Sequence, residues 1–180
     1  MVDTPFIADP RDRQKKMATR QVNVQRFSVT SSKAFSDVVA AFETAIGHPD
    51  MASFSRSIAD AKTFAELEKI VQGAVGQSGL MEFMYVDLGA VLRKRNGAAA
   101  PNSVRFILGN PVIMSRMVQH VPDAGSYAPV TVLIDERKEG VHLSYDRMAS
   151  FLDSYGNSEA LEVARELDSK VETLLVAAAK

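Results

Sequence analysis

The fold of this chain is decided by the stretch SVRFILGNPVIMSRMVQHVPDAGSYAPVTVLIDERKEGVHLSYD, residues 103–146. Apolar and polar residues alternate over 103–109, 129–135 and 140–145, which is typical of strands with one buried face. Between the first two strands the sequence predicts a short helix over 111–120, followed by a turn. A hairpin loop joins the last two strands. The stretch therefore predicts antiparallel strands interrupted by one helix.

The flanking sequence supplies the remaining elements of this layer. A strand is predicted over 21–30 and another over 80–88, with Leu92 to Arg95 extending the second strand after a kink at Gly89. Apolar stripes at helical spacing predict two helices between these strands and one long helix from about 157 to 178. Thr63 and Glu66 form a capping box at the start of the second helix.

The strands alternate and are not continuously apolar, which favours an antiparallel sheet over a parallel one. The expected architecture is α+β, with about five antiparallel strands, helices on one face and the order β-α-β(4)-α. The opposite face of such a sheet needs a cover. We expect a second subunit or a ligand to supply it.

Length and composition favour a single domain. The chain has 180 residues, 46% of them hydrophobic and 24% charged, which suits one full-sized core. Residues 1–20 are polar and contain two prolines, so we expect a flexible or loosely docked tail. Residues 21–180 form the predicted domain, within which 50–62 is weakly patterned.

Charge and residue usage exclude several classes of function. Lysine plus arginine number 21 against 22 acidic residues, so the net charge of −1 argues against nucleic acid or anionic lipid as a partner. The absence of cysteine removes disulfides, thiolate zinc sites and cysteine nucleophiles, and it fits a cytoplasmic protein. The three histidines lie far apart, so no metal site or other cofactor is expected. No apolar run approaches a membrane span, and no signal-peptide core is present.

A candidate ligand site lies where the strand of residues 103–109 meets the following helix. Gly109 suits a tight bend, Asn110 a helix N-cap and Pro111 the first helical position. The same helix start presents the amides of Val112 and Ile113 at the positive end of the helix dipole. A carboxylate or phosphate would find donors there.

Two further side chains complete this candidate site. Arg105 on the preceding strand would supply a counter-charge for an anion. Tyr127, which lies between two prolines, would form a wall of the pocket or donate a hydrogen bond. The predicted ligand-binding residues are therefore Arg105, Gly109, Asn110 and Tyr127.

Two other functions remain open. Asp135, His142 and Asp146 gather around the final hairpin with other acidic residues, and a carboxylate beside a histidine could transfer protons in an enzyme. Strand alternation alone, however, also places His142 and Asp146 on a solvated face. A non-catalytic interaction module is the third hypothesis, with the apolar seam of the last helix or the open sheet face as its surface.

Four short segments together carry a resemblance to a known family: Phe106-Ile-Leu-Gly-Asn-Pro, Pro122-Asp-Ala, Ala128-Pro-Val-Thr-Val-Leu-Ile and Gly140-Val-His-Leu-Ser-Tyr-Asp. The chain resembles the domain of unknown function 302 family, also called TT1751-like, over roughly residues 21–179. The resemblance implies a TATA-box-binding-protein-like α+β fold, often dimeric, with no settled activity and no catalytic residue to carry over. Compared with members of this family, the chain resembles one with an insertion at residues 48–62. Many members also have a histidine near the end of the second strand, where this chain has Val86-Asp-Leu-Gly.

These observations lead to one preferred hypothesis. The chain is expected to be a small-molecule binding or sensing domain for an anionic ligand, acting as a homodimer. Its pocket is expected between the sheet and the helix that starts after Asn110.

Overall fold

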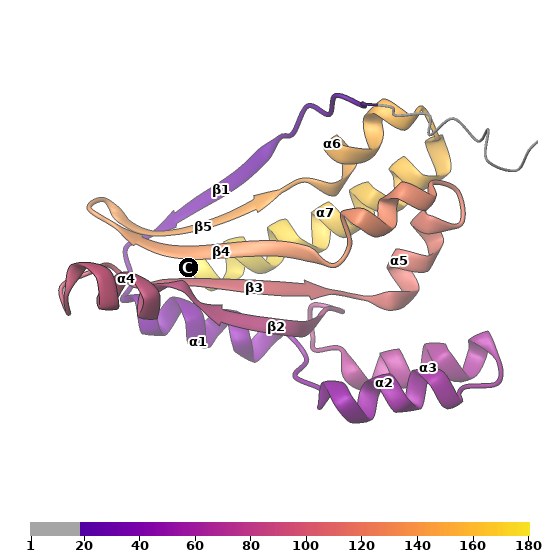
Figure 1. The fold of residues 1–180 in the computed structure, drawn as a ribbon, viewed down its shortest axis with the longest axis horizontal. Coiled ribbons are helices and arrows are strands. Elements are labelled where there is room, and N and C mark those ends of the chain that lie inside the picture. Colours follow the sequence, from indigo (N-terminus) through magenta and orange to yellow (C-terminus); the bar gives the residue numbers. More distant parts are fainter. Residues whose placement is uncertain (1–18) are drawn as a thin grey trace, which may run out of the picture.

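A computed structural model describes residues 19–180, so most of the expected N-terminal tail lies outside the described residues. Five strands form one antiparallel sheet in the order β1-β5-β4-β3-β2 (Figure 1). The strands are β1 (Arg26–Ser31), β2 (Met81–Asp87), β3 (Ser103–Gly109), β4 (Val130–Arg137) and β5 (Gly140–Asp146). The helices are α1 (Phe35–Ala45), α2 (Met51–Asp60), α3 (Phe64–Ala74), α4 (Leu88–Asn96), α5 (Pro111–Val118), α6 (Met148–Leu152) and α7 (Ser158–Ala179), with 3-10 turns η1 (Pro122–Ser126) and η2 (Asp153–Tyr155).

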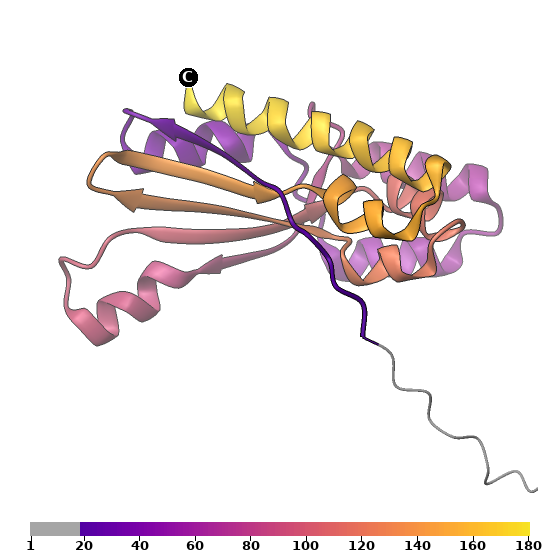
Figure 2. The same cartoon turned by 90° about the horizontal axis from the view of Figure 1, so that it is seen from above.

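One face of the sheet carries the main core. Helix α7 packs on β1 and β5, and α1 packs beside α7 and against β4. Figure 2 shows α1 and α7 together along one side of the sheet, with α4 apart from them. On β3, Val104, Phe106 and Leu108 point toward these helices and are at most 3% exposed. The expected α+β architecture with helices on one face is confirmed.

Within residues 19–180, no helical layer lies across the other face of the sheet. Residues that alternate with the buried ones face this side, including Arg105 and Thr131, which are exposed, and Ile107 and Leu133, which are half-buried. The strand register places Arg105 opposite Leu133, and Ile107 opposite Thr131. We call this surface the open face. Its existence was the central structural expectation from the sequence.

The expected extension of the second strand is wrong. The chain leaves β2 at Asp87 and forms helix α4 in place of a kinked strand. The reason is local, because the Asp87 carboxylate accepts the amide of Ala90 at 2.8 Å and so caps the helix. The same carboxylate pairs with Arg93 one and a half turns later, at 2.8 Å. The cap and this ion pair stabilise the helix although Gly89 and Val91 are poor helix formers.

The weakly patterned segment before residue 62 forms a further helix, α2, which pairs with α3 (Figure 1). Asp50 caps α2 by accepting the amide of Ser53 at 2.8 Å. This helical pair has its own small core, in which Phe54, Val71 and Met81 are buried. Packing against a satellite cluster, separate from the main core, explains why the segment shows only a faint apolar pattern.

The helical pair joins the sheet through a narrow neck made of two glycines. Gly47 precedes α2 and Gly76 follows α3, and the amides of both donate to the carbonyl of Leu80, at 2.9 and 3.0 Å. A Cβ on Gly47 would overlap the carbonyl of Ala74, and a Cβ on Gly76 would overlap the backbone of Ile46. Only glycine permits the two segments to cross this closely.

Candidate functional site

Arg105 and Tyr127, two of the four predicted ligand residues, line a groove on the open face. The groove has a volume of about 510 Å³. Thr131, Leu133 and Ser144 from β4 and β5 also line it, beside Arg105 from β3. We call this concavity the open-face groove. Its lining combines two arginines, the Asp146 carboxylate, hydroxyl-bearing side chains and apolar surface in a space of ligand size.

Arg105 lies near the middle of this surface. The register of the sheet places it between Val86 on β2 and Leu133 on β4, so apolar side chains flank it on both sides. Among residues 19–180, its guanidinium has no hydrogen-bond or ion-pair partner. The other arginine of the groove, Arg26, is engaged by Asp146 through two contacts of 2.7 and 2.8 Å. Arg105 is therefore the cation of the groove that is free to meet an anion.

Tyr127 forms the end wall of the groove together with Phe151. The two rings stack with centroids 4.7 Å apart and planes 16° apart. The Tyr127 hydroxyl is bonded to the hydroxyl of Tyr155 at 3.1 Å, and this hydrogen bond raises the pKa of Tyr155. Of the two roles expected for Tyr127, the geometry therefore favours a wall.

Gly109 and Asn110 line a different space. It is an apolar cavity of about 130 Å³, lined also by Phe83, Met114 and Met117. The sequence-based expectation joined all four predicted residues in one pocket, whereas the structure places two in each of two concavities. Pro129 and Val130 line both and lie between them.

Asn110 acts as a structural cap of α5. Its Oδ1 accepts the amides of Val112 at 2.9 Å and Ile113 at 3.3 Å, and its Nδ2 donates to the carbonyl of Gly79 at 3.0 Å. The two amides that were expected to meet an anion thus already have a partner in the chain. Asn110 therefore links the start of α5 to the segment just before β2.

The three polar residues of the last hairpin do not converge on one point. Asp135 pairs with Arg137 at 2.7 Å and Asp146 with Arg26 at 2.7 Å. His142 lies opposite Asp135 in the strand register but contacts Glu139, at 3.0 Å, and it lies four positions before Asp146 along β5. Within residues 19–180, each carboxylate is thus engaged by an arginine, and neither is hydrogen-bonded to His142.

The apolar seam of the last helix is not an interaction surface. Leu167, Val171 and Leu174 are at most 3% exposed, because this side of α7 packs against the sheet. An exposed apolar edge occurs instead on β2, the last strand of the sheet order. Met84 and Tyr85 are 53% and 43% exposed there. Within residues 19–180, no strand pairs with the outer side of β2 beyond the single bridge between Gly47 and Met81.

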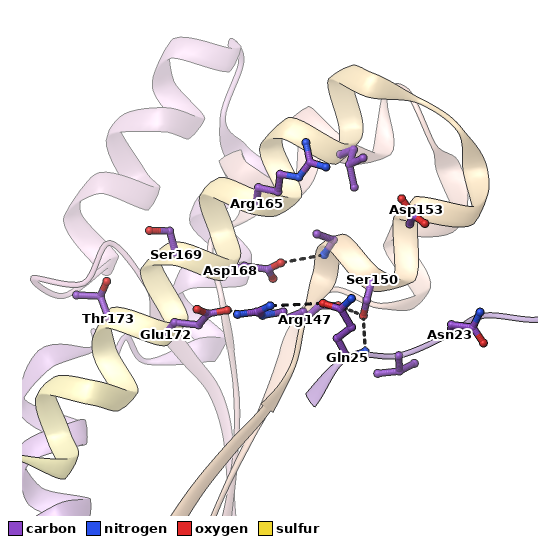
Figure 3. Close-up of a pocket in the computed structure, with 13 residues that line it drawn as sticks. Asn23, Gln25, Arg147, Ser150, Asp153, Arg165, Asp168, Ser169, Glu172 and Thr173 are labelled. Carbon is purple, nitrogen blue, oxygen red and sulfur yellow. Dashed lines mark hydrogen bonds and ion pairs between the residues drawn. The ribbon is translucent and has the colours of Figure 1, made fainter. Parts of the chain in front are cut away.

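A third and larger concavity was missed by sequence reasoning (Figure 3). It has a volume of about 670 Å³ and lies between α7, the α6–η2 segment and the extended residues 23–25. Its lining is largely polar, with side chains of α7 facing those of Arg147, Ser150 and Asp153 across the space. We call it the polar cleft.

Asp168 of α7 forms the back wall of the polar cleft. It is 6% exposed, and its Oδ1 accepts the Tyr145 hydroxyl and the Met148 amide, both at 2.7 Å. Its Oδ2 accepts the Ala149 amide at 3.1 Å. Burial raises the pKa of Asp168, although the three hydrogen-bond donors act to lower it. The pKa of Tyr145 is also raised, by burial and by the neighbouring Asp168 charge. The one sequence signal was an acidic residue beside Leu167 within an apolar helical stripe.

The outer wall of the polar cleft is the extended segment before β1. The amide of Gln25 donates to Ser150 Oγ at 3.0 Å, and the amide of Arg147 donates to the Gln25 carbonyl at 2.9 Å. Further along, Arg20 donates to the Ser154 carbonyl at 2.7 Å and lies over the Tyr155 ring at 4.1 Å. These contacts hold the segment against α6 and η2.

Two kinds of feature are absent from residues 19–180. No cluster of three or more histidine, aspartate or glutamate side chains is arranged to hold a metal ion there. No helix in the same range is both long and apolar enough to cross a bilayer.

Comparisons with known proteins agree with the resemblance that the sequence motifs carry. A crystal structure of an uncharacterized conserved protein DUF302 from Bacillus stearothermophilus matches with a TM-score of 0.60 at 10% identity, covering 86% of this chain and 98% of that chain. At this identity the match shows a shared fold. No curated protein matches the chain. The family model described as "Domain of unknown function DUF302" matches residues 54–178, well over half of the sequence. The chain therefore belongs to the domain of unknown function 302 family.

Proposed function

We propose that this chain is a small-molecule binding or sensing domain that takes an anionic ligand in the open-face groove and acts as a homodimer. The observation that carries the proposal is Arg105. It is exposed on the floor of a groove of about 510 Å³ and, among residues 19–180, has no partner of opposite charge.

The chemistry of the groove selects the kind of ligand. A guanidinium binds a carboxylate or phosphate through two parallel hydrogen bonds. Thr131 and Ser144 add hydroxyls, while Leu133 and the stacked rings of Tyr127 and Phe151 add apolar surface. A ligand with an anionic head and a flat or apolar body would use all of these groups.

The proposed dimer uses the outer side of β2. Edge strands are usually protected by charged residues or proline, yet the outer part of β2 carries Met84 and Tyr85 in exposed positions. The opposite edge strand, β1, carries Arg26, Ser28 and Thr30. A second copy can add its own β2 antiparallel across a two-fold axis, which is the commonest symmetry of soluble oligomers.

The ligand proposal is tested with the purified full-length chain. Co-purifying metabolites are identified by mass spectrometry, and a panel of carboxylates and phosphates is screened by thermal shift and calorimetry. For the tightest binder, Arg105→Ala is expected to weaken affinity about tenfold to a hundredfold, the worth of one charge-assisted bidentate contact. Arg56→Ala, an exposed arginine on α2, is the matched control and is expected to leave affinity unchanged. Equal affinities of both variants and the wild type would overturn the assignment of Arg105.

The dimer proposal is tested separately by light scattering after size exclusion. The wild type is expected at twice the chain mass, and Tyr85→Lys at the chain mass, because a charge on the edge opposes strand pairing. Val91→Lys on α4, which is also an exposed apolar residue, is the control and is expected to remain dimeric. A monomeric wild type, or a dimeric Tyr85→Lys variant, contradicts the proposed interface.

A further inference from the structure

The polar cleft is chemically distinct from the open-face groove. It lies on the other side of β5, between α7, the α6–η2 segment and residues 23–25 (Figure 3). Its volume of about 670 Å³ lies within the range that holds small-molecule ligands. Residues 23–25 are far in sequence from the other two walls, so the space is formed by the tertiary fold and not by one loop.

Most charges inside the polar cleft are already balanced. Arg147 and Glu172 form an ion pair at 2.7 Å, and the Arg147 side chain also reaches the Gln25 side chain at 3.4 Å. Asp168 is satisfied by the three donors described above. These groups give the cleft a fixed polar wall in which each of the three charged side chains already has a partner within the protein.

Two charged side chains of the cleft differ from this pattern. Arg165 enters from α7 and Asp153 from η2, so they approach the space from opposite walls (Figure 3). Within residues 19–180, neither side chain has an ion-pair or hydrogen-bond partner, and they do not reach each other. The cleft thus presents one uncompensated positive and one uncompensated negative group, separated by open space.

From this arrangement we infer that the polar cleft binds a small amphoteric molecule, with its anionic group on Arg165 and its amine on Asp153. A purely anionic ligand would meet the carboxylates of Asp153, Asp168 and Glu172, and a purely cationic one would meet Arg165. A molecule carrying both charges satisfies both walls and enters without net charge.

The remaining lining fits the body of such a molecule. Asn23, Ser169 and Thr173 offer neutral hydrogen-bonding groups, while Val24 and Leu161 offer apolar contact. An aminocarboxylic acid with a short aliphatic spacer matches this combination. The inference concerns a second site and does not depend on the proposed function of the open-face groove.

The probe is a homologous series in which the distance between the two charges grows: glycine, 3-aminopropanoate, 4-aminobutanoate, 5-aminopentanoate and 6-aminohexanoate, together with the common α-amino acids. Amide shifts of the full-length protein are followed by NMR during titration. At least one member is expected to give saturable shifts in residues 23–25, 153 and 161–173. Pentanoate and pentylamine, which each keep one charge, are expected to bind about tenfold more weakly or worse, because one charge-assisted contact is lost.

The variants Arg165→Gln and Asp153→Asn test the two walls one at a time. Both positions are exposed, so the variants are expected to fold, and each should weaken the best binder by about tenfold or more. Arg56→Gln is the control and should bind like the wild type.

Three results would overturn the inference. The first is the absence of saturable shifts in the cleft with every aminocarboxylic acid of the panel. The second is equal binding of pentanoate or pentylamine and the best amphoteric probe. The third is unchanged affinity in both cleft variants, which would show that these charges are solvated and do not contact a ligand.

Discussion

The two faces of the sheet show opposite uses of the same five strands. On the helix-covered face of β3, Phe106 is fully buried and packs against the rings of Phe42 and Tyr85, at 4.7 and 5.2 Å. One residue earlier, Arg105 points to the open face and is exposed. Burial on one side supplies the stability of the fold, since stabilisation scales with apolar area removed from water. The residues on the open face contribute little to this burial, so their identity can be set by a ligand or partner.

The largest expected effect comes from truncating the buried face. Phe106→Ala should lower the free energy of unfolding by about 3–5 kcal/mol, because it removes a large core side chain and leaves a cavity. Arg105→Ala, its neighbour on the open face, should change that free energy by about 0.5 kcal/mol or less. Urea unfolding of the two variants measures the contrast. Similar losses in both would mean that the open face also holds the fold together.

The next effect concerns Asp168, a buried carboxylate of α7. Asp168→Ala should cost about 3 kcal/mol, because it leaves the buried Tyr145 hydroxyl and the Ala149 amide without acceptors. Tyr145→Phe should cost less, since Asp168 keeps the Met148 and Ala149 amides. The same unfolding experiment ranks the two variants. A larger loss in Tyr145→Phe would show that the Tyr145 hydroxyl, and not the carboxylate, organises the start of α6.

The pH dependence of Asp168 has a defined sign. Burial raises its pKa in the folded chain above the unfolded value of about 3.9, so the folded state holds its proton more tightly. The resulting stabilisation is complete below about pH 4 and is lost as the pH rises through the raised folded pKa. The stability advantage of the wild type over Asp168→Asn should therefore narrow as the pH rises above 4. An advantage that widens over this range would mean that the three donors outweigh burial.

The smallest effect is expected from the ion pair at the rim of the open face. Arg26 and Asp146 are joined by two contacts, but the Arg26 side chain is 65% exposed. A double-mutant cycle with Arg26→Ala and Asp146→Ala should give a coupling energy of about 0.5 kcal/mol, decreasing with added salt. A salt-independent coupling of several kcal/mol would place this rim in a drier environment than the structure shows.

The strands, the main core and the open face could be predicted because period-two alternation reports burial directly. Val104, Phe106 and Leu108 alternate with Arg105 and Ile107, and this pattern fixes both the strand and its two faces. Helix α4 could not be predicted in this way, since its start depends on a single carboxylate that caps it. Helix α2 was missed because only Phe54 is buried in it.

The candidate sites were predicted less well, for a physical reason. Arg105 was identified as a counter-charge on the strand before the helix, and Tyr127 as a ring between two prolines; both line the open-face groove. Asn110 has the local signature of a helix cap, and a sequence alone does not show that its cap also satisfies the amides proposed for a ligand. The polar cleft depends on α7 meeting residues 23–25, and no local pattern reports a contact over such a separation.

The glycine neck has a consequence for how this chain tolerates change in length. Gly47 and Gly76 bring the departing and returning backbone together at the Leu80 carbonyl, so the sheet register is set without reference to the helices beyond that crossing. The α2–α3 pair is an appendage to a sheet whose strand pairing does not depend on it. It can be shortened, exchanged or lost in a relative while the five strands keep their alignment, provided that the crossing remains free of side chains and Met81 is covered.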